Sequence, residues 1–275
     1  MKELTLLELQ REELKILKDV HEFCVKNDIC YSLYGGTQIG AMRHKGFIPW
    51  DDDIDIIMPR KDYTRFCKEY YSDKYEIACV ENNKDYMLGF ARVFDCKSTT
   101  MISYYPWIYK DVGVWIDVFP ADGMPSDVKE IKRLYDRVIR LREWLTFVRC
   151  STVSYSMSSS FVWKIKLFVK KIMTFNGKIG HILAKRMNKI MQTYDFETSP
   201  YWASLSNVRG LHEKKHHIKS TFQSCVLVDF EDMKAYIMNG TDAVLRDRYK
   251  DYMKLPPENE RIPMGSSYVH YYWKE

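Results

Sequence analysis

The sequence predicts one globular fold that mixes helices with β-strands. Short runs with strand-forming composition or a two-residue alternation occur at 30–34, 51–58 and 113–119. Segments with apolar residues at helical spacing surround them, the longest at 5–27 and 127–148. The chain has 275 residues, 46% of them hydrophobic, with 12 glycines. This ordinary composition excludes collagen, a disordered chain and a small disulfide scaffold.

The first helix and the strand at 51–58 have the clearest patterns. In 5–27, Leu14, Leu17 and Cys24 recur at helical spacing, which predicts an amphipathic helix. In 51–58 aspartate and isoleucine alternate, which predicts a strand with carboxylates on one face. The other expected elements are strands over 30–34, 88–94, 113–119 and 225–230, and helices over 38–44, 61–71, 127–148 and 241–252. The alternation in 113–119 predicts two faces, one with Trp115, Asp117 and Phe119 and one with Val114, Ile116 and Val118.

Positive charge is concentrated in one part of the chain. The formal net charge is +5, but 144–194 holds nine Lys or Arg and no Asp or Glu, so the remainder is mildly acidic. Within this stretch, 161–175 and 177–191 separate apolar from basic side chains on a helical wheel. These segments either lie at a membrane interface or form a helical hairpin packed on the core. We expect a core over 1–143, a basic helical insertion over 144–194 and a C-terminal part over 195–275.

Composition also indicates in which cellular compartment the protein works and which kinds of partner it binds. The seven cysteines include no CxxC pair, and the charged N-terminus is unlike a signal peptide. No run of 18 uncharged apolar residues predicts a transmembrane helix. These features favour a cytoplasmic protein, and the local basic stretch favours an anionic surface over nucleic acid as a partner.

Four aspartates within five residues form the sharpest chemical signal, at Asp51, Asp52, Asp53 and Asp55. Crowded carboxylates repel one another unless they are fully solvated or hold a cation. The interleaved apolar residues argue against full solvation, so the cluster predicts a Mg²⁺ or Mn²⁺ site. Asp117, on another expected strand, is the candidate for a third carboxylate of a two-metal site. The alternatives are a solvated acidic turn or an adventitious calcium site for the cluster, and an ordinary strand carboxylate for Asp117.

Glycines and basic residues near the acids predict phosphate contacts. Gly35, Gly36 and Thr37 precede a short expected helix, where backbone N–H groups can approach a phosphate. The cations that could neutralise a diphosphate are Arg43, His44, Lys45, Arg60 and Arg92. A common turn and ordinary surface salt bridges are the alternatives.

The run at 35–37 followed by 43–55 resembles the LicD family of phosphotransferases, which includes fukutin-type proteins. Weaker similarity continues through 60–63, 115–120 and 249–253, and most of the chain outside 144–194 is covered. The resemblance implies an α+β fold with a nucleotidyltransferase-like mixed sheet core and flanking helices. It also implies transfer of phosphocholine or an alditol phosphate from a CDP-linked donor to a hydroxyl of a glycan.

The resemblance assigns roles to the acids. It implies that Asp51, Asp53, Asp55 and Asp117 bind metal, and we take Asp53, Asp55 and Asp117 as the catalytic carboxylates. The acceptor can be a lipid-linked glycan precursor at the inner face of the membrane. Two positions depart from the family's pattern: Lys250 stands where glycine is expected, and His270 is the nearest histidine after Arg261.

Other function classes remain open from the sequence. A nucleotidyltransferase would use the same carboxylates to transfer NMP from an NTP. A catalytically silent membrane-associated scaffold would not need the intact Asp53, Asp55 and Asp117. The HExxH pattern at 212–216 matches zinc proteases, but its inner residues are lysines and no apolar helical flank surrounds it. We interpret it as an exposed basic turn.

Overall fold

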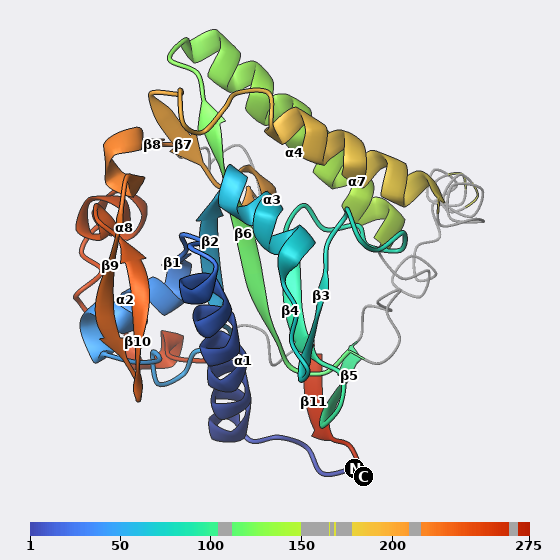
Figure 1. Ribbon diagram of the computed structural model, residues 1–275, viewed down its shortest axis with the longest axis vertical. Coiled ribbons are helices and arrows are strands. Elements are labelled where there is room, and N and C mark those ends of the chain that lie inside the picture. Colours follow the sequence, from blue (N-terminus) through green and yellow to red (C-terminus); the bar gives the residue numbers. More distant parts are fainter. Residues whose placement is uncertain (104–111, 150–164, 166–167, 169–177, 209–215, 264–268) are drawn as a thin grey trace.

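The computed structural model describes residues 1–103, 112–149, 165, 168, 178–208, 216–263 and 269–275 (Figure 1). Within them a mixed sheet runs in the order β1 (Ser32–Leu33), β2 (Asp55–Pro59), β6 (Trp115–Met124), β4 (Ala91–Asp95) and β3 (Tyr75–Ala78). β7 (Tyr201–Ala203) pairs with the end of β6, and β8 (His217–Ile218) pairs with β7. The β2–β6 pair is parallel and the other pairs are antiparallel.

Helices and two small two-stranded sheets surround this sheet. The helices are α1 (Leu6–Lys26), α2 (Gly35–His44), α3 (Arg60–Glu69), α4 (Val128–Arg149), α7 (Lys178–Met191) and α8 (Thr241–Tyr249). The small sheets pair β9 (Cys225–Phe230) with β10 (Met233–Met238), and β5 (Thr99–Ser103) with β11 (Val269–Trp273). Short 3₁₀ turns cover Leu205–Asn207, Lys219–Phe222 and Glu258–Glu260. The two chain ends lie together beside β11, where the Met1 ammonium is 2.8 Å from Glu275 Oε1 (Figure 1).

The two faces of β6 pack into two different apolar clusters, as the sequence predicts. Ile116 and Val118 pack in the cluster that includes the apolar faces of α1 and α3. Trp115 and Phe119 pack in the cluster that includes α4 and α7. Asp117 lies on the second face by the same alternation. The expectation of an α+β fold with a mixed sheet core and flanking helices is confirmed.

Most expected helices are present within one to three residues of their predicted ends. α1 begins after Thr5, whose side chain and that of Glu8 form a capping box. The helix expected over 38–44 begins three residues earlier, because 35–37 form the first turn of α2. Strands β3, β5, β7, β8, β10 and β11 were not predicted.

The strand expected over 51–58 begins only at Asp55. A loop precedes it, in which Asp51 N–H donates to the Ile48 carbonyl and the Asp51 carbonyl accepts from Gln10 Nε2. A regular strand would turn Asp52 away from Asp51 and Asp53, whereas the loop lets all three carboxylates converge. This difference is central to the site described below.

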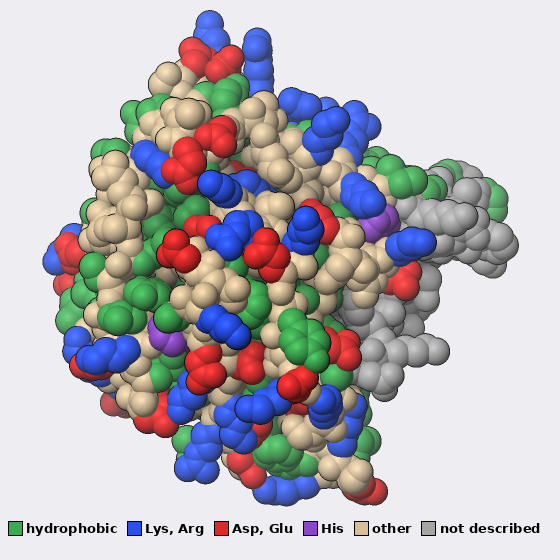
Figure 2. Space-filling view, in the orientation of Figure 1, with side chains coloured by type: hydrophobic (Ala, Val, Ile, Leu, Met, Phe, Trp, Pro, Cys, Tyr) green, Lys and Arg blue, Asp and Glu red, His purple; other side chains and the backbone are tan. Residues whose placement is uncertain are grey.

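The basic stretch is described only in part. The segment 161–175 lies outside the described residues except for Ile165 and Phe168, and so do 212–215 of the HExxH pattern. α7 packs against α4 and buries Ala184, Met187 and Met191 in the core. Among the described helices, none is long and apolar enough to cross a membrane. On the face in Figure 2, basic and acidic side chains are interspersed over most of the surface.

Candidate active site

The carboxylates predicted from the sequence converge at the start of β2. Asp51, Asp52 and Asp53 each offer an oxygen, and these oxygens lie within 4.8 Å of one another. Asp55 opens β2 and is the in-register neighbour of Asp117 on β6. Adjacent strands are about 4.8 Å apart and in-register side chains share a face, so Asp55 and Asp117 lie side by side.

Crowding and burial strongly perturb these acids. Burial, together with the negative charges of Asp53 and Asp52, raises the pKa of Asp51 to about 8. Burial and the charges of Asp53 and Asp117 raise the pKa of Asp55 well above its usual range. Among the described residues, the buried Asp51 Oδ2 has no hydrogen-bond partner. A converging set of carboxylate oxygens with one buried orphan fits the ligand chemistry of a hard divalent cation.

In the absence of divalent cations, stability is expected to fall as pH rises from 5 to 8. The Asp51 carboxyl titrates near 4 in an unfolded chain and at about 8 in the fold. Between these values the folded state binds the extra proton, so raising the pH favours unfolding by up to about 1.4 kcal/mol per pH unit per proton. Urea unfolding of chelator-treated protein at pH 5, 6, 7 and 8 measures this slope. Asp51→Asn should flatten it, and an equal slope in that variant would contradict the assignment.

The first turn of α2 packs directly against these acids. Gly35 has a φ of +61°, and a Cβ there would lie 3.1 Å from Asp55 Oδ2. A Cβ at Gly36 would lie 2.6 Å from Asp51 Oδ2, which leaves no room for a side chain. Thr37 Oγ1 accepts a hydrogen bond from the Asp55 N–H at 2.9 Å. The helix N-terminus, which favours negative charge, therefore faces the acid cluster.

Of the five cations expected at the site, the structure brings Arg92 into contact with the acids. Arg92 lies opposite Asp117 on β4, and its Nε is 2.6 Å from Asp117 Oδ1. Its guanidinium also lies 4.2 Å from the centre of the Trp115 ring. The arginine thus fixes both the Asp117 carboxylate and the neighbouring ring.

The other cations have different partners. Arg43 Nη1 donates to the carbonyls of Tyr252 and Lys254, at 2.7 and 3.2 Å. The His44 ring meets Trp50 edge-on, and the backbone of Lys45 ends α2. Arg60 follows β2 at the end away from Asp55, and Asp122 and Asn188 bind its guanidinium. The structure therefore does not bring Arg60 to the acid cluster.

Two charged residues near the acids were missed in the sequence. Glu13 on α1 is 1% exposed, and its Oε2 has no hydrogen-bond partner within the described parts of the chain. Its spacing from Leu9, Ile16 and Leu17, which places it on the buried face, could have revealed it. Arg248 on α8 bonds the Tyr34 hydroxyl and its charge acts on Asp55. Nothing in the sequence connects α8 with β2.

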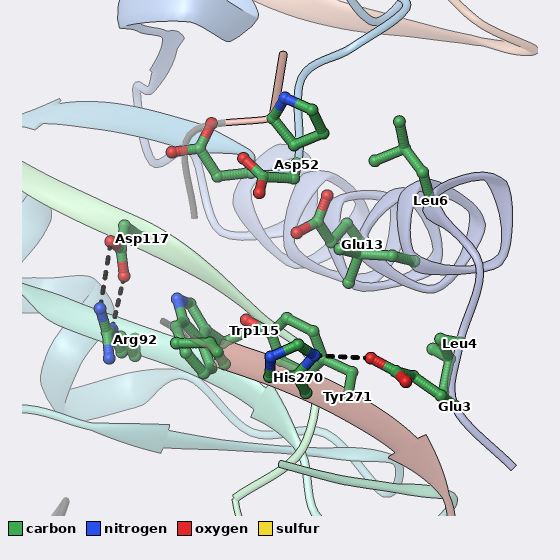
Figure 3. Close-up of a pocket in the computed structure, with 14 residues that line it drawn as sticks. Glu3, Leu4, Leu6, Glu13, Asp52, Arg92, Trp115, Asp117, His270 and Tyr271 are labelled. Carbon is green, nitrogen blue, oxygen red and sulfur yellow. Dashed lines mark hydrogen bonds and ion pairs between the residues drawn. The ribbon is translucent and has the colours of Figure 1, made fainter. Parts of the chain in front are cut away.

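A cavity of about 320 Å³ adjoins the acid cluster. Asp52 and Glu13 project toward it from one side, and Trp115, His270 and Tyr271 lie across from them (Figure 3). Arg92 and Asp117 line it near β6 and β4.

Lys250, which stands where the family's pattern has glycine, has a glycine-like backbone conformation. Its φ is +59°, in the region that favours glycine.

Comparisons with known proteins identify the family of this chain. A family model described as LicD/FKTN/FKRP, nucleotidyltransferase domain, matches residues 28–147. The chain is 34% identical over 271 residues to the lipopolysaccharide cholinephosphotransferase LicD of Haemophilus influenzae, covering 96% of this chain and 97% of that protein. This chain belongs to the LicD family. It is thus a LicD-family phosphotransferase, and the matched domain holds all the acids from Asp51 to Asp117.

Two shorter similarities cover part of this LicD-family chain. An uncharacterized protein of Rickettsia typhi is 37% identical over 108 residues, which cover 39% of this chain and 33% of that protein. An uncharacterized protein of Rickettsia prowazekii is 48% identical over 113 residues, which cover 41% of this chain and 40% of that protein.

Proposed function

We propose that this LicD-family phosphotransferase transfers a phospho-alcohol from a CDP-linked donor to a hydroxyl of a cell-surface glycan or its lipid-linked precursor. The observation that carries the proposal is the convergence of the Asp51–Asp53 oxygens beside the in-register pair of Asp55 and Asp117. The name of the Haemophilus relative supports phosphocholine as the transferred group and lipopolysaccharide as the acceptor. The basic stretch at 144–194 supports the proposal that the enzyme acts at the inner face of a membrane.

The proposal includes Mg²⁺ or Mn²⁺ as the cofactor, held by Asp51, Asp53, Asp55 and Asp117. Such an ion, when bound, would neutralise negative charge on the donor diphosphate and lower the pKa of the acceptor hydroxyl. The perturbed pKa values of Asp51 and Asp55 support this role, since a cation would relieve the repulsion that raises them.

The protein's own groups would position the reactants and balance charge. Asp117, fixed by Arg92, would orient the acceptor hydroxyl and take its proton. The first-turn N–H groups of α2 and the Arg248 guanidinium add positive potential beside Asp55, which suits the leaving CMP. Phosphoryl transfer depends mainly on such positioning and charge stabilisation, so this set of groups suffices.

The assay is incubation with CDP-choline, CDP-glycerol or CDP-ribitol, Mg²⁺ and a lipopolysaccharide acceptor. We expect release of CMP with at least one donor, transfer of its phospho-alcohol to the glycan, and loss of both with a chelator. Release of pyrophosphate from an NTP, with the nucleotide kept on the product, would instead assign a nucleotidyltransferase. No turnover of any donor would leave the scaffold alternative and overturn the proposal.

A further inference from the structure

A second group of metal-ligating side chains lies away from the acid cluster, between α3 and the loop that follows β3. The Sγ atoms of Cys67 and Cys79 and a carboxylate oxygen of Glu81 all lie within 4.8 Å of one another. Cys67 is on α3, Cys79 and Glu81 directly follow β3, and both cysteines are free thiols. The sequence has no CxxC pair, so this group exists only because the fold brings α3 against the end of β3.

The Glu81 carboxylate is held in place although Glu81 is an exposed residue. Asn188 Nδ2 on α7 donates to Glu81 Oε1, and Asn188 Oδ1 accepts from Arg60 Nη1 at 3.0 Å. Arg60 in turn is fixed by the fully buried Asp122. Carboxylates that ligate metals are commonly oriented by hydrogen bonds of this kind. The third member of the group is therefore positioned by the surrounding structure.

The surroundings of Cys79 favour the thiolate, which is the form of cysteine that binds metals. Cys79 and Cys67 are 0% and 7% exposed. The Cys67 thiol donates to Cys79 and, together with the backbone N–H groups of Asn82 and Glu81, lowers the pKa of the Cys79 thiol. The Cys79 N–H donates to Asn82 Oδ1 at 2.9 Å, which closes this loop on the cysteine.

The set of donor atoms indicates the class of metal. Thiolate sulfur favours Zn²⁺, whereas Mg²⁺ and Mn²⁺ prefer oxygen ligands. A tetrahedral Zn²⁺ with bonds of about 2.3 Å to sulfur and 2.0 Å to oxygen has neighbouring ligand atoms about 3.5–3.8 Å apart, so movements of about 1 Å or less would close these three side chains on the ion. Buried cysteines that only fill a core need no carboxylate beside them.

We propose that Cys67, Cys79 and Glu81 bind a Zn²⁺ ion, with water at the fourth position on the exposed side of Glu81. Binding releases the thiol protons to solvent and leaves both sulfurs as thiolates. Because Asn188 and Arg60 hold Glu81, the bound ion would link the β3 loop and α3 to α7. The site is structural and separate from the carboxylates of the acid cluster, so it does not depend on the proposed function.

Binding of Co²⁺ tests the site without turnover. The full chain is freed of metal with a chelator, kept reduced with a phosphine and titrated with Co²⁺. We expect a saturable sulfur-to-cobalt charge-transfer absorption that disappears when Zn²⁺ is added. Co²⁺ held by carboxylates alone gives no such absorption, so Asp55→Asn should leave it unchanged.

Variants identify the ligands. Cys79→Ser should abolish the absorption, and Glu81→Gln should raise the Co²⁺ dissociation constant by about tenfold or more. The matched controls are Cys96→Ser, at the opposite end of the β3–β4 pair, and Asp85→Asn, an exposed acid close to Glu81 in the chain. Both should bind Co²⁺ as the wild type does.

Two results would overturn the proposal: no charge-transfer absorption in the folded, reduced wild-type chain, or the same absorption in Cys79→Ser. Circular dichroism shows whether each variant is folded. Glu81 is exposed, so Glu81→Gln keeps the test decisive even where Cys79→Ser does not fold. An unchanged dissociation constant in Glu81→Gln would also overturn the site.

Thermal unfolding tests the structural role. In the Asp55→Asn chain, Zn²⁺ at a hundredfold excess over its dissociation constant should raise Tm by about 5 °C or more. The rise should be smaller when Glu81→Gln is added, and an equal rise in the two chains would contradict a Zn²⁺ site at these residues. Phosphotransfer is not measured, so failure of the proposed function would leave this result standing.

Discussion

Asp55→Asn is expected to lower the rate of CMP release by about a thousandfold or more. Asp55 lies between the Asp51–Asp53 loop and Asp117, so it joins the two halves of the carboxylate set. The substitution keeps the shape of the side chain and the hydrogen bond from its backbone N–H to Thr37. It also removes one charge from a crowded cluster, so the metal-free variant should unfold at a temperature no lower than that of the wild type.

The matched control for this loss is Asp229→Asn. Asp229 is exposed on β9 and pairs with Lys234 at the surface, an interaction worth little in stability or catalysis. Initial rates and thermal unfolding should both be unchanged. Asp55→Asn with wild-type activity, or with a loss explained by unfolding, would contradict the role assigned to Asp55.

Arg60→Met is expected to destabilise the fold by about 3–5 kcal/mol. Arg60 donates from Nε and Nη2 to the two oxygens of Asp122, at 2.6 and 2.8 Å, and the Asp122 side chain is fully buried. Removal of the arginine leaves a buried carboxylate without its charge partner, which is among the costlier changes in a core. Urea unfolding with and without the substitution measures the change in free energy.

The double variant Arg60→Met/Asp122→Leu separates the two interpretations of this arginine. It removes both charges, so it should recover much of the lost stability. If Arg60 instead contacts the donor, as the sequence first indicates, Arg60→Met would raise KM for the donor with little effect on unfolding. That result would contradict the structural role seen here.

The sheet at the centre of the fold was predictable where its pattern is local. The alternation in 113–119 predicts both faces of β6, because each face meets its own apolar layer. β11, in contrast, could not be predicted from a local pattern. Its backbone pairs with β5, about 170 residues earlier in the chain, and this choice depends on tertiary packing. No strand was therefore predicted over 269–273.

The clustering of the acids was predictable, but their backbone geometry was not. The density of aspartates between Asp51 and Asp55 predicts a cation site whatever backbone carries them, and that site stays a prediction. The alternation there predicts too long a strand, since aspartates at 51–53 form a loop that a two-residue period cannot reveal. Glu13 and Arg248 reach the site from α1 and α8, and only the folded chain places them there.

Binding of Mn²⁺, followed by electron paramagnetic resonance, tests the central claim most directly. The account predicts saturable binding to the wild-type chain, competition by Mg²⁺, and loss of the bound signal in Asp55→Asn but not in Asp229→Asn. The same bound signal in both variants, or none in the folded wild-type chain, would contradict a metal centre at these carboxylates.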